Sequence, residues 1–113
     1  DWAGHSNETN YLINEFIDFD NTIKDLINFV TIDENTLLIV TADHETGGLQ
    51  VLKQEKGKFI IQWLNGKHTA QPVTVHAYGP GANLFTGVMD NTEIHNKILE
   101  IFNYKNLQKS KCS

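Results

Sequence analysis

The sequence predicts an α/β fold in which helices flank a central sheet that also carries a β-hairpin. Three patterns indicate this class: a long helical stripe near the N-terminus, a continuous apolar run after it, and two short apolar segments around a turn. With 113 residues the chain has the length of one small domain, so we expect a single hydrophobic core.

The first helix is predicted from apolar residues that recur at alternating intervals of four and three. They are Leu12, Phe16, Phe19, Ile23, Leu26 and Val30. This spacing places them on one stripe of an α-helix that we expect over residues 7–30. The polar residues between them fall largely off the stripe, as the solvated face of such a helix does.

A strand is predicted over residues 36–41, after the turn-forming segment Asp33-Glu34-Asn35. The run is rich in β-branched residues and does not alternate, which is typical of a strand covered on both faces. No strand of matching length lies beside it in the sequence. We therefore expect the sheet to be completed by strands outside this chain.

The remaining elements are a hairpin, a strand and a second helix. Residues 49–54 and 59–64 flank a four-residue loop, as the arms of a β-hairpin do. A strand over residues 73–78 ends at Gly79-Pro80-Gly81, and the acidic start at Asp90 predicts a helix over residues 91–104. A polar tail is expected over residues 106–113.

Composition excludes several classes of function. The 9 Lys and Arg against 14 Asp and Glu give a net charge of −5, which opposes binding to nucleic acid. The longest apolar run, Leu37–Val40, is far shorter than the ~20 residues of a membrane span. A single cysteine, Cys112, excludes an internal disulfide and a Cys-rich zinc site. A bound metal would therefore need histidine and carboxylate ligands.

Acidic and histidine residues gather at the ends of the predicted elements. Asp1 and His5 precede the first helix, Asp43 and His44 directly follow the buried strand, and His68 lies in a turn. Ligands of open α/β sheets bind at the carboxyl ends of strands, and zinc accepts imidazole and carboxylate ligands. Taken singly, each pair would also fit a surface turn or a helix cap.

Other histidines favour structural or exposed roles, because His76 lies within a strand pattern and His95 within a helix pattern. The dipeptide His44-Glu45 lacks the second histidine of the motif His-Glu-x-x-His, since position 48 is Gly48. A metalloprotease site of that kind is excluded.

Four segments, taken in order, resemble the C-terminal part of alkaline phosphatases. They are Asp1-Trp2-Ala3-Gly4-His5-Ser6-Asn7, Val40-Thr41-Ala42-Asp43-His44-Glu45-Thr46-Gly47-Gly48, His68-Thr69 and Ala77-Tyr78-Gly79-Pro80-Gly81-Ala82. The resemblance runs from residue 1 to about residue 102, and the order of the segments makes it specific. It implies part of the alkaline-phosphatase central sheet with flanking helices.

The resemblance also implies a pair of zinc ions and the hydrolysis of phosphate monoesters. In the family, residues matching Asp1, His5 and His68 hold one zinc ion, and residues matching Asp43 and His44 contribute to the second. Two such ions stabilise the attacking and leaving oxygens of a phosphoryl transfer. The family adds a nucleophilic serine that becomes a phosphoserine, an arginine that grips the phosphate, and a magnesium site.

In the family order, the serine, the arginine and the magnesium ligands precede the position of Asp1. None of Ser6, Ser110 and Ser113 lies in the context of that nucleophile. The resemblance therefore implies the last quarter to third of an alkaline phosphatase, with residues 1–105 as part of its domain. We expect this chain to be inactive alone and to need the missing N-terminal part as its partner.

The resemblance further implies a periplasmic or extracellular location and a homodimer. Two alternatives stay open. A phosphodiesterase or a cofactor-independent phosphoglycerate mutase of the same superfamily also has Asp-His after a strand, although His68-Thr69 and Gly79-Pro80-Gly81 favour an alkaline phosphatase. The other alternative is a non-catalytic α/β interaction module with exposed strand edges.

Overall fold

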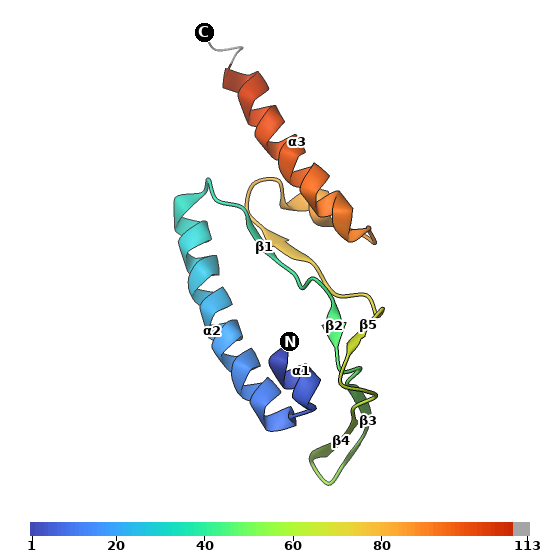
Figure 1. Ribbon diagram of the computed structural model, residues 1–113. Coiled ribbons are helices and arrows are strands. Elements are labelled where there is room, and N and C mark those ends of the chain that lie inside the picture. The colour runs from blue at the N-terminus through green and yellow to red at the C-terminus, as the bar shows by residue number, and fades with distance from the viewer. Residues whose placement is uncertain (110–113) are drawn as a thin grey trace. The chain divides into compact units, whose positions relative to one another are not determined.

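The computed structural model describes residues 1–109 (Figure 1). In chain order its elements are α1 (Trp2–Ser6), α2 (Thr9–Asp33), β1 (Leu38–Val40), β2 (Glu45–Thr46), β3 (Gln50–Glu55), β4 (Lys58–Gln62), β5 (His68–Thr69), β6 (His76–Tyr78), the 3-10 helix η1 (Ala82–Phe85) and α3 (Asn91–Lys109). Helices combine with three antiparallel strand pairs, so the predicted α/β class is confirmed.

The chain divides into two compact units, whereas the sequence predicts one core. The first unit consists of residues 1–26 and 41–74, and the second consists of residues 27–40 and the chain from residue 75 onward. Among the described residues, the buried apolar side chains are Ala3 in the first unit and Val30 and Phe85 in the second. Each unit therefore packs around its own small set of buried residues.

Two strand pairs belong to the first unit. The β3–β4 hairpin is the predicted one, but its turn is Lys56-Gly57 rather than a four-residue loop. The φ angles of these residues are 49° and 77°, and positive φ at both central positions matches the right-handed twist of a hairpin. The β2–β5 pair places Glu45 opposite Thr69 and Thr46 opposite His68.

The β1–β6 pair of the second unit places Ile39 opposite Ala77 and is shorter than the sequence predicts. Strand β1 covers Leu38–Val40 instead of residues 36–41, and β6 covers His76–Tyr78 instead of residues 73–78. All three residues of β1 are half-buried. The expected coverage of both faces is therefore not observed in the described chain.

The predicted helix over residues 7–30 is α2, and the sequence did not predict the short helix α1 that ends before it at Asn7. This residue adopts a left-handed conformation, with φ of 55°, and the N–H groups of Asn7 and Glu8 donate to the carbonyls of Gly4 and Ala3. Such hydrogen bonds close a helix C-terminus. The second helix, α2, then continues to Asp33 and ends at Glu34, whose φ is 58°.

The apolar stripe of α2 is covered only in part. Val30 is buried, and Leu12 and Ile23 are half-buried, but Phe16 and Phe19 are 64% and 47% exposed. The rings of Phe16 and Phe19 contact each other edge to face, with centroids 6.3 Å apart. The residues of the stripe thus differ widely in burial along α2.

Helix α3 begins where the sequence predicts and ends later. The Asp90 carboxylate accepts hydrogen bonds from the Thr92 N–H at 3.0 Å and from its hydroxyl at 2.6 Å, which confirms the predicted acidic cap. The helix continues to Lys109, beyond the predicted end at residue 104 and into the expected tail. The rest of that tail, residues 110–113, lies outside the described residues. No helix in the described chain is long and apolar enough to cross a membrane.

Candidate metal centre

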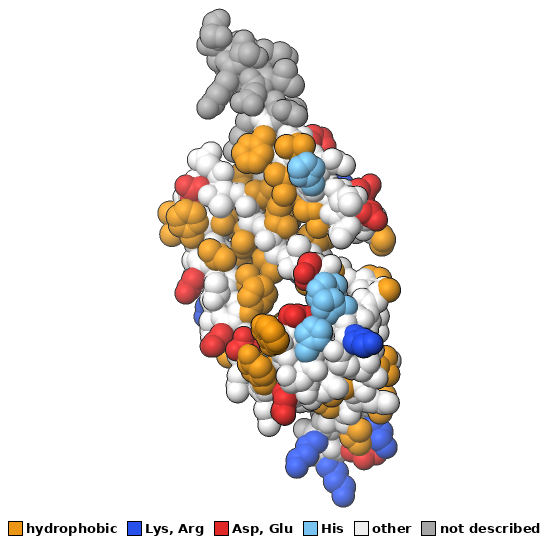
Figure 2. Space-filling view, viewed as in Figure 1, with side chains coloured by type: hydrophobic (Ala, Val, Ile, Leu, Met, Phe, Trp, Pro, Cys, Tyr) orange, Lys and Arg blue, Asp and Glu red, His pale blue; other side chains and the backbone are white. Residues whose placement is uncertain are grey.

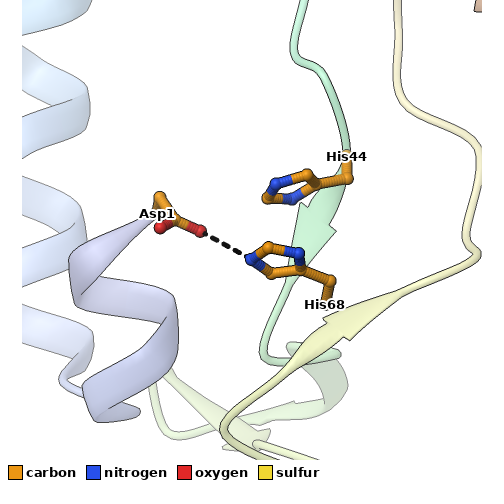
Figure 3. A group of neighbouring side chains, drawn as sticks. All are labelled: Asp1, His44 and His68. Atoms are coloured by element: carbon orange, nitrogen blue, oxygen red, sulfur yellow. Dashed lines mark ion pairs between the residues drawn. The ribbon is translucent and has the colours of Figure 1, made fainter.

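Three elements of the first unit bring Asp1, His44 and His68 together (Figure 3). Asp1 directly precedes α1, His44 directly precedes β2, and His68 opens β5. One ligand atom from each of the three side chains lies within 4.8 Å of the others. This is the separation expected of side chains that share one cation.

Close packing of α1 against β2 brings Asp1 to the two histidines. Gly4 of α1 is buried, and a Cβ atom built there would lie 2.8 Å from the Thr46 carbonyl oxygen and 2.9 Å from the Thr46 Cγ2. Both distances are shorter than an ordinary van der Waals contact of about 3.5 Å. The glycine therefore permits an approach that a larger residue would prevent.

Glu45 ties together the two segments that carry the histidines. Its Oε1 accepts a hydrogen bond from the Gly48 N–H at 2.8 Å, and its Oε2 accepts one from the Thr69 hydroxyl. Glu45 and Thr69 are the neighbours of His44 and His68 and face each other across the β2–β5 pair. The carboxylate thus adds a side-chain link to a strand pair of only two residues on each side.

His5 adjoins this group and presents a lone pair to it. Its Nδ1 lies 2.7 Å from the Gly66 carbonyl oxygen, and a carbonyl only accepts, so Nδ1 carries the proton. In the neutral ring, Nε2 is then an acceptor. This Nε2 lies 3.1 Å from Nε2 of His68 and 3.3 Å from Oδ2 of Asp1.

The imidazole of His68 lies between the other candidate ligands. Its ring stacks on that of His44 with centroids 3.5 Å apart, and its Nε2 lies 3.4 Å from Oδ1 of Asp1. Partial removal from water, together with the nearby rings of His44 and His5, lowers the pKa of His68 below its ordinary value of 6.5. The neutral ring, which is the form that binds metals, is thereby favoured.

Asp43 lies at the margin of the group. Its carboxylate is 86% exposed, and its Oδ2 lies 3.3 Å from Nε2 of His44. The group of three contains His44, whereas the resemblance places His5 with Asp1 and His68 on one ion. The exposed residues His76 and His95 lie in the second unit and do not belong to this group.

Sequence reasoning missed Thr46, Glu45 and the Gly66 carbonyl as neighbours of the candidate ligands. The hydrogen bond from Thr46 to Asp1 joins residues 45 positions apart, and that from His5 to Gly66 joins residues 61 positions apart. No local signal identifies these partners, because they depend on the packing of α1 against β2. Figure 2 shows histidine and acidic side chains next to one another on the face that it draws.

Comparison with known proteins gives consistent results. The family model of alkaline phosphatase matches residues 1–62 and 54–104. Alkaline phosphatase 3 of Bacillus subtilis is 26% identical over 92% of this chain, and the matched region is 38% of that protein. The chain thus spans little more than a third of this curated relative.

Solved structures show the same likeness. The alkaline phosphatase from the Antarctic bacterium TAB5 is 41% identical, with a TM-score of 0.83 over 92% of this chain and 33% of that one. A mutant of the TAB5 enzyme with Mg bound in its M3 site aligns with a TM-score of 0.80 over 88% of this chain and 32% of that one.

Proposed function

The chain belongs to the alkaline phosphatase family, and on that premise we propose that it supplies zinc ligands to a centre that hydrolyses phosphate monoesters. The observation that carries the proposal is the convergence of one carboxylate and three imidazoles from Asp1, His5, His44 and His68. The carboxyl-to-histidine distances of 3.3–3.4 Å support a shared cation.

The donor atoms fit zinc in type and protonation. Zinc is bound by neutral imidazole nitrogen and carboxylate oxygen. Nε2 of His5 lies 3.1 Å from Nε2 of His68. Because the proton of His5 is on Nδ1, its Nε2 has a lone pair, and at most His68 has a proton between these two nitrogens. A cation between these atoms and the Asp1 carboxylate would satisfy electron pairs that otherwise face one another.

By the family pattern, Asp1, His5 and His68 would hold one zinc ion, and Asp43 and His44 would contribute to a second. Bound ions of this kind polarise a phosphate oxygen and make hydroxide available near neutral pH. The Asp1 carboxylate would bind the first ion, while the lowered pKa of His68 favours its unprotonated imidazole. The magnesium of the TAB5 mutant supports a divalent cation centre in the family, and by the family pattern we place the magnesium ligands outside these 113 residues.

We place the nucleophile outside these 113 residues. All nine cationic residues are lysines, so no arginine is present to grip a phosphate, and Ser6 lies in no nucleophile motif. The proposed substrates are phosphate monoesters, and the proposed partners are the remainder of an alkaline phosphatase and a second copy of the whole protein. The family resemblance supports a periplasmic or extracellular location.

Zinc content measured by elemental analysis tests the metal part of the proposal. The chain is dialysed against zinc and then against zinc-free buffer, alongside the variants His68→Ala and His95→Ala. His95 is the matched control, because it is exposed on α3 and does not belong to the group. We expect tightly held zinc in the wild type and His95→Ala and its loss in His68→Ala. Equal zinc in all three proteins, or none in the wild type, would contradict the proposal.

A second assay tests the catalytic part. We expect no hydrolysis of p-nitrophenyl phosphate by the zinc-loaded chain alone, because it lacks the serine and the arginine. Turnover that disappears in His44→Ala would show that this chain carries a complete active site, and the placement of the nucleophile elsewhere would be wrong.

A further inference from the structure

Thr46 contacts two of the proposed ligands at once. Its Oγ1 lies 2.7 Å from Oδ1 of Asp1 and 3.3 Å from Nδ1 of His44. A carboxylate only accepts hydrogen bonds, so the single hydroxyl proton of Thr46 is donated to Asp1. The hydroxyl then has no proton to donate to Nδ1 of His44 and can only accept one from it.

The direction of these hydrogen bonds affects which nitrogen of His44 has a free lone pair and how the Asp1 carboxylate is oriented. With its proton on Nδ1, the neutral ring of His44 has a lone pair on Nε2, the nitrogen that lies 3.3 Å from the Asp43 carboxylate. On Asp1, the bond occupies Oδ1 and holds the carboxylate so that Oδ2 lies 3.3 Å from Nε2 of His5. One hydroxyl therefore favours the Nδ1–H tautomer of His44 and holds the orientation of the Asp1 carboxylate.

The position of that hydroxyl is itself fixed by packing. The backbone of Thr46 is paired with His68 across β2 and β5, and its Cγ2 lies against Gly4 of α1. The methyl and the hydroxyl of a threonine share one Cβ atom, so fixing the methyl fixes the hydroxyl as well. The side chain is half-buried, which shields its hydrogen bonds from competing water.

We propose that Thr46 is a positioning residue of the zinc centre, with the hydrogen bonds running from His44 to Thr46 and from Thr46 to Asp1. The inference rests on the proposed zinc function, because only that function makes Asp1 and His44 ligands. Hydrogen-bond partners behind metal ligands typically change metal affinity by about 10- to 100-fold when they are removed.

The test compares three variants of this chain. Thr46→Val keeps the branched shape and removes the hydroxyl, whereas Thr46→Ser keeps the hydroxyl and removes the methyl. Thr22→Val is the matched control, because the Thr22 hydroxyl on exposed α2 donates only to the Asp18 carbonyl. Zinc affinity is measured by competition with a chromophoric chelator, and the visible spectrum of bound Co²⁺ reports the geometry of the ligands.

We expect Thr46→Val to bind zinc about 10- to 100-fold more weakly and to alter the Co²⁺ spectrum. Thr46→Ser should retain most of the affinity, and Thr22→Val should match the wild type. In the metal-free protein, ¹⁵N NMR of the imidazoles should show the Nδ1–H tautomer of His44 in the wild type and in Thr46→Ser. In Thr46→Val, that tautomer should lose its predominance.

The outcomes separate the two proposals. Unchanged zinc affinity and an unchanged His44 tautomer in Thr46→Val would overturn the role of Thr46 while leaving the zinc centre in place. A wild-type chain that binds neither zinc nor Co²⁺ would overturn both. If Thr46→Val fails to fold, Thr46→Ser is compared with Thr46→Ala, because both lack the methyl and only the serine keeps the hydroxyl. Weaker zinc binding by Thr46→Ala would support the role of the hydroxyl, and equal binding by the two variants would overturn it.

Discussion

Substitution of Gly4 by alanine tests whether close packing of α1 on β2 sets the geometry of the metal centre. The new Cβ would lie 2.8 Å from the Thr46 carbonyl oxygen and 2.9 Å from its Cγ2. Restoring a carbon–carbon contact of about 3.5 Å requires a separation of roughly 0.6 Å. Functional sites tolerate displacements of about 0.5 Å, so Asp1 and His5 would move out of reach of their partners.

The expected change in stability is smaller than the expected change in zinc binding. Alanine is favoured over glycine within a helix by about 1 kcal/mol, whereas overpacking costs about 1–3 kcal/mol. The two terms oppose each other, so Gly4→Ala should lower the free energy of unfolding by no more than about 2 kcal/mol. Zinc affinity should fall at least tenfold, as it does when ligand orientation is disturbed.

The assay combines urea unfolding of the metal-free chain with zinc competition, and Gly57→Ala serves as control. Gly57 has positive φ and no atom within 4 Å of its built Cβ, so alanine there strains a hairpin turn and touches nothing else. The control should lose stability and keep its zinc affinity. If Gly4→Ala instead gains stability by about 1 kcal/mol and binds zinc like the wild type, the substitution acts through helix propensity alone. Close packing of α1 on β2 would then not set the geometry of the metal centre.

Three further predictions concern the strand link, the α3 cap and the histidines. Glu45→Ala should lower the free energy of unfolding by about 1–3 kcal/mol, because it removes the acceptor of the Gly48 N–H and the Thr69 hydroxyl. An unchanged midpoint in urea titrations would contradict the role of Glu45 in joining β2 to β5. Hydrogen bonds from the Thr92 side chain and N–H lower the pKa of Asp90 below 3.8, so its contribution to stability is complete above that pH and disappears as the pH falls through the lower folded value. Circular dichroism of the chain should therefore show an acid-induced loss of helix that is smaller in Asp90→Asn. Equal titration curves for the two proteins would contradict the role of Asp90 as the cap of α3. Partial removal from water and the nearby rings of His44 and His5 lower the pKa of His68 from 6.5, so its ring takes up a proton at lower pH than an ordinary histidine does. Zinc affinity should therefore be kept as the pH falls to 6.5 and should decline at lower pH; competition assays between pH 5 and 8 would contradict this if affinity already fell steeply above pH 6.5.

Local pattern was enough to predict much of the secondary structure. The helical stripe of α2, the hairpin, and the Asp90 cap depend on residues close in sequence, and the structure contains all three. The predictions failed at helix boundaries, where the backbone conformation of single residues decides where a helix begins or ends. Asn7 separates α2 from the unpredicted helix α1 through a left-handed φ of 55°, which few residues other than glycine, asparagine and aspartate adopt readily.

Packing explains what the pattern could not predict. The continuous run around Leu38 predicts a strand covered on both faces, but such coverage depends on neighbours that the described chain does not supply. The five candidate ligands came from a family resemblance and from their places at element ends. Their geometry, including the hydroxyl of Thr46 between Asp1 and His44, follows from the fit of α1 on β2 and has no local signal.

The distribution of the ligands along the chain has a consequence for folding. By the family pattern one ion would join Asp1 and His5 to His68, so it would close a loop of about 63 residues between His5 and His68. Joining distant segments removes conformational freedom from the unfolded chain and so stabilises the folded state. This stabilisation grows slowly with loop length, as it does for a disulfide. The metal would then act as a reversible crosslink in a chain that has no internal disulfide, and its concentration would set how much of the first unit is folded.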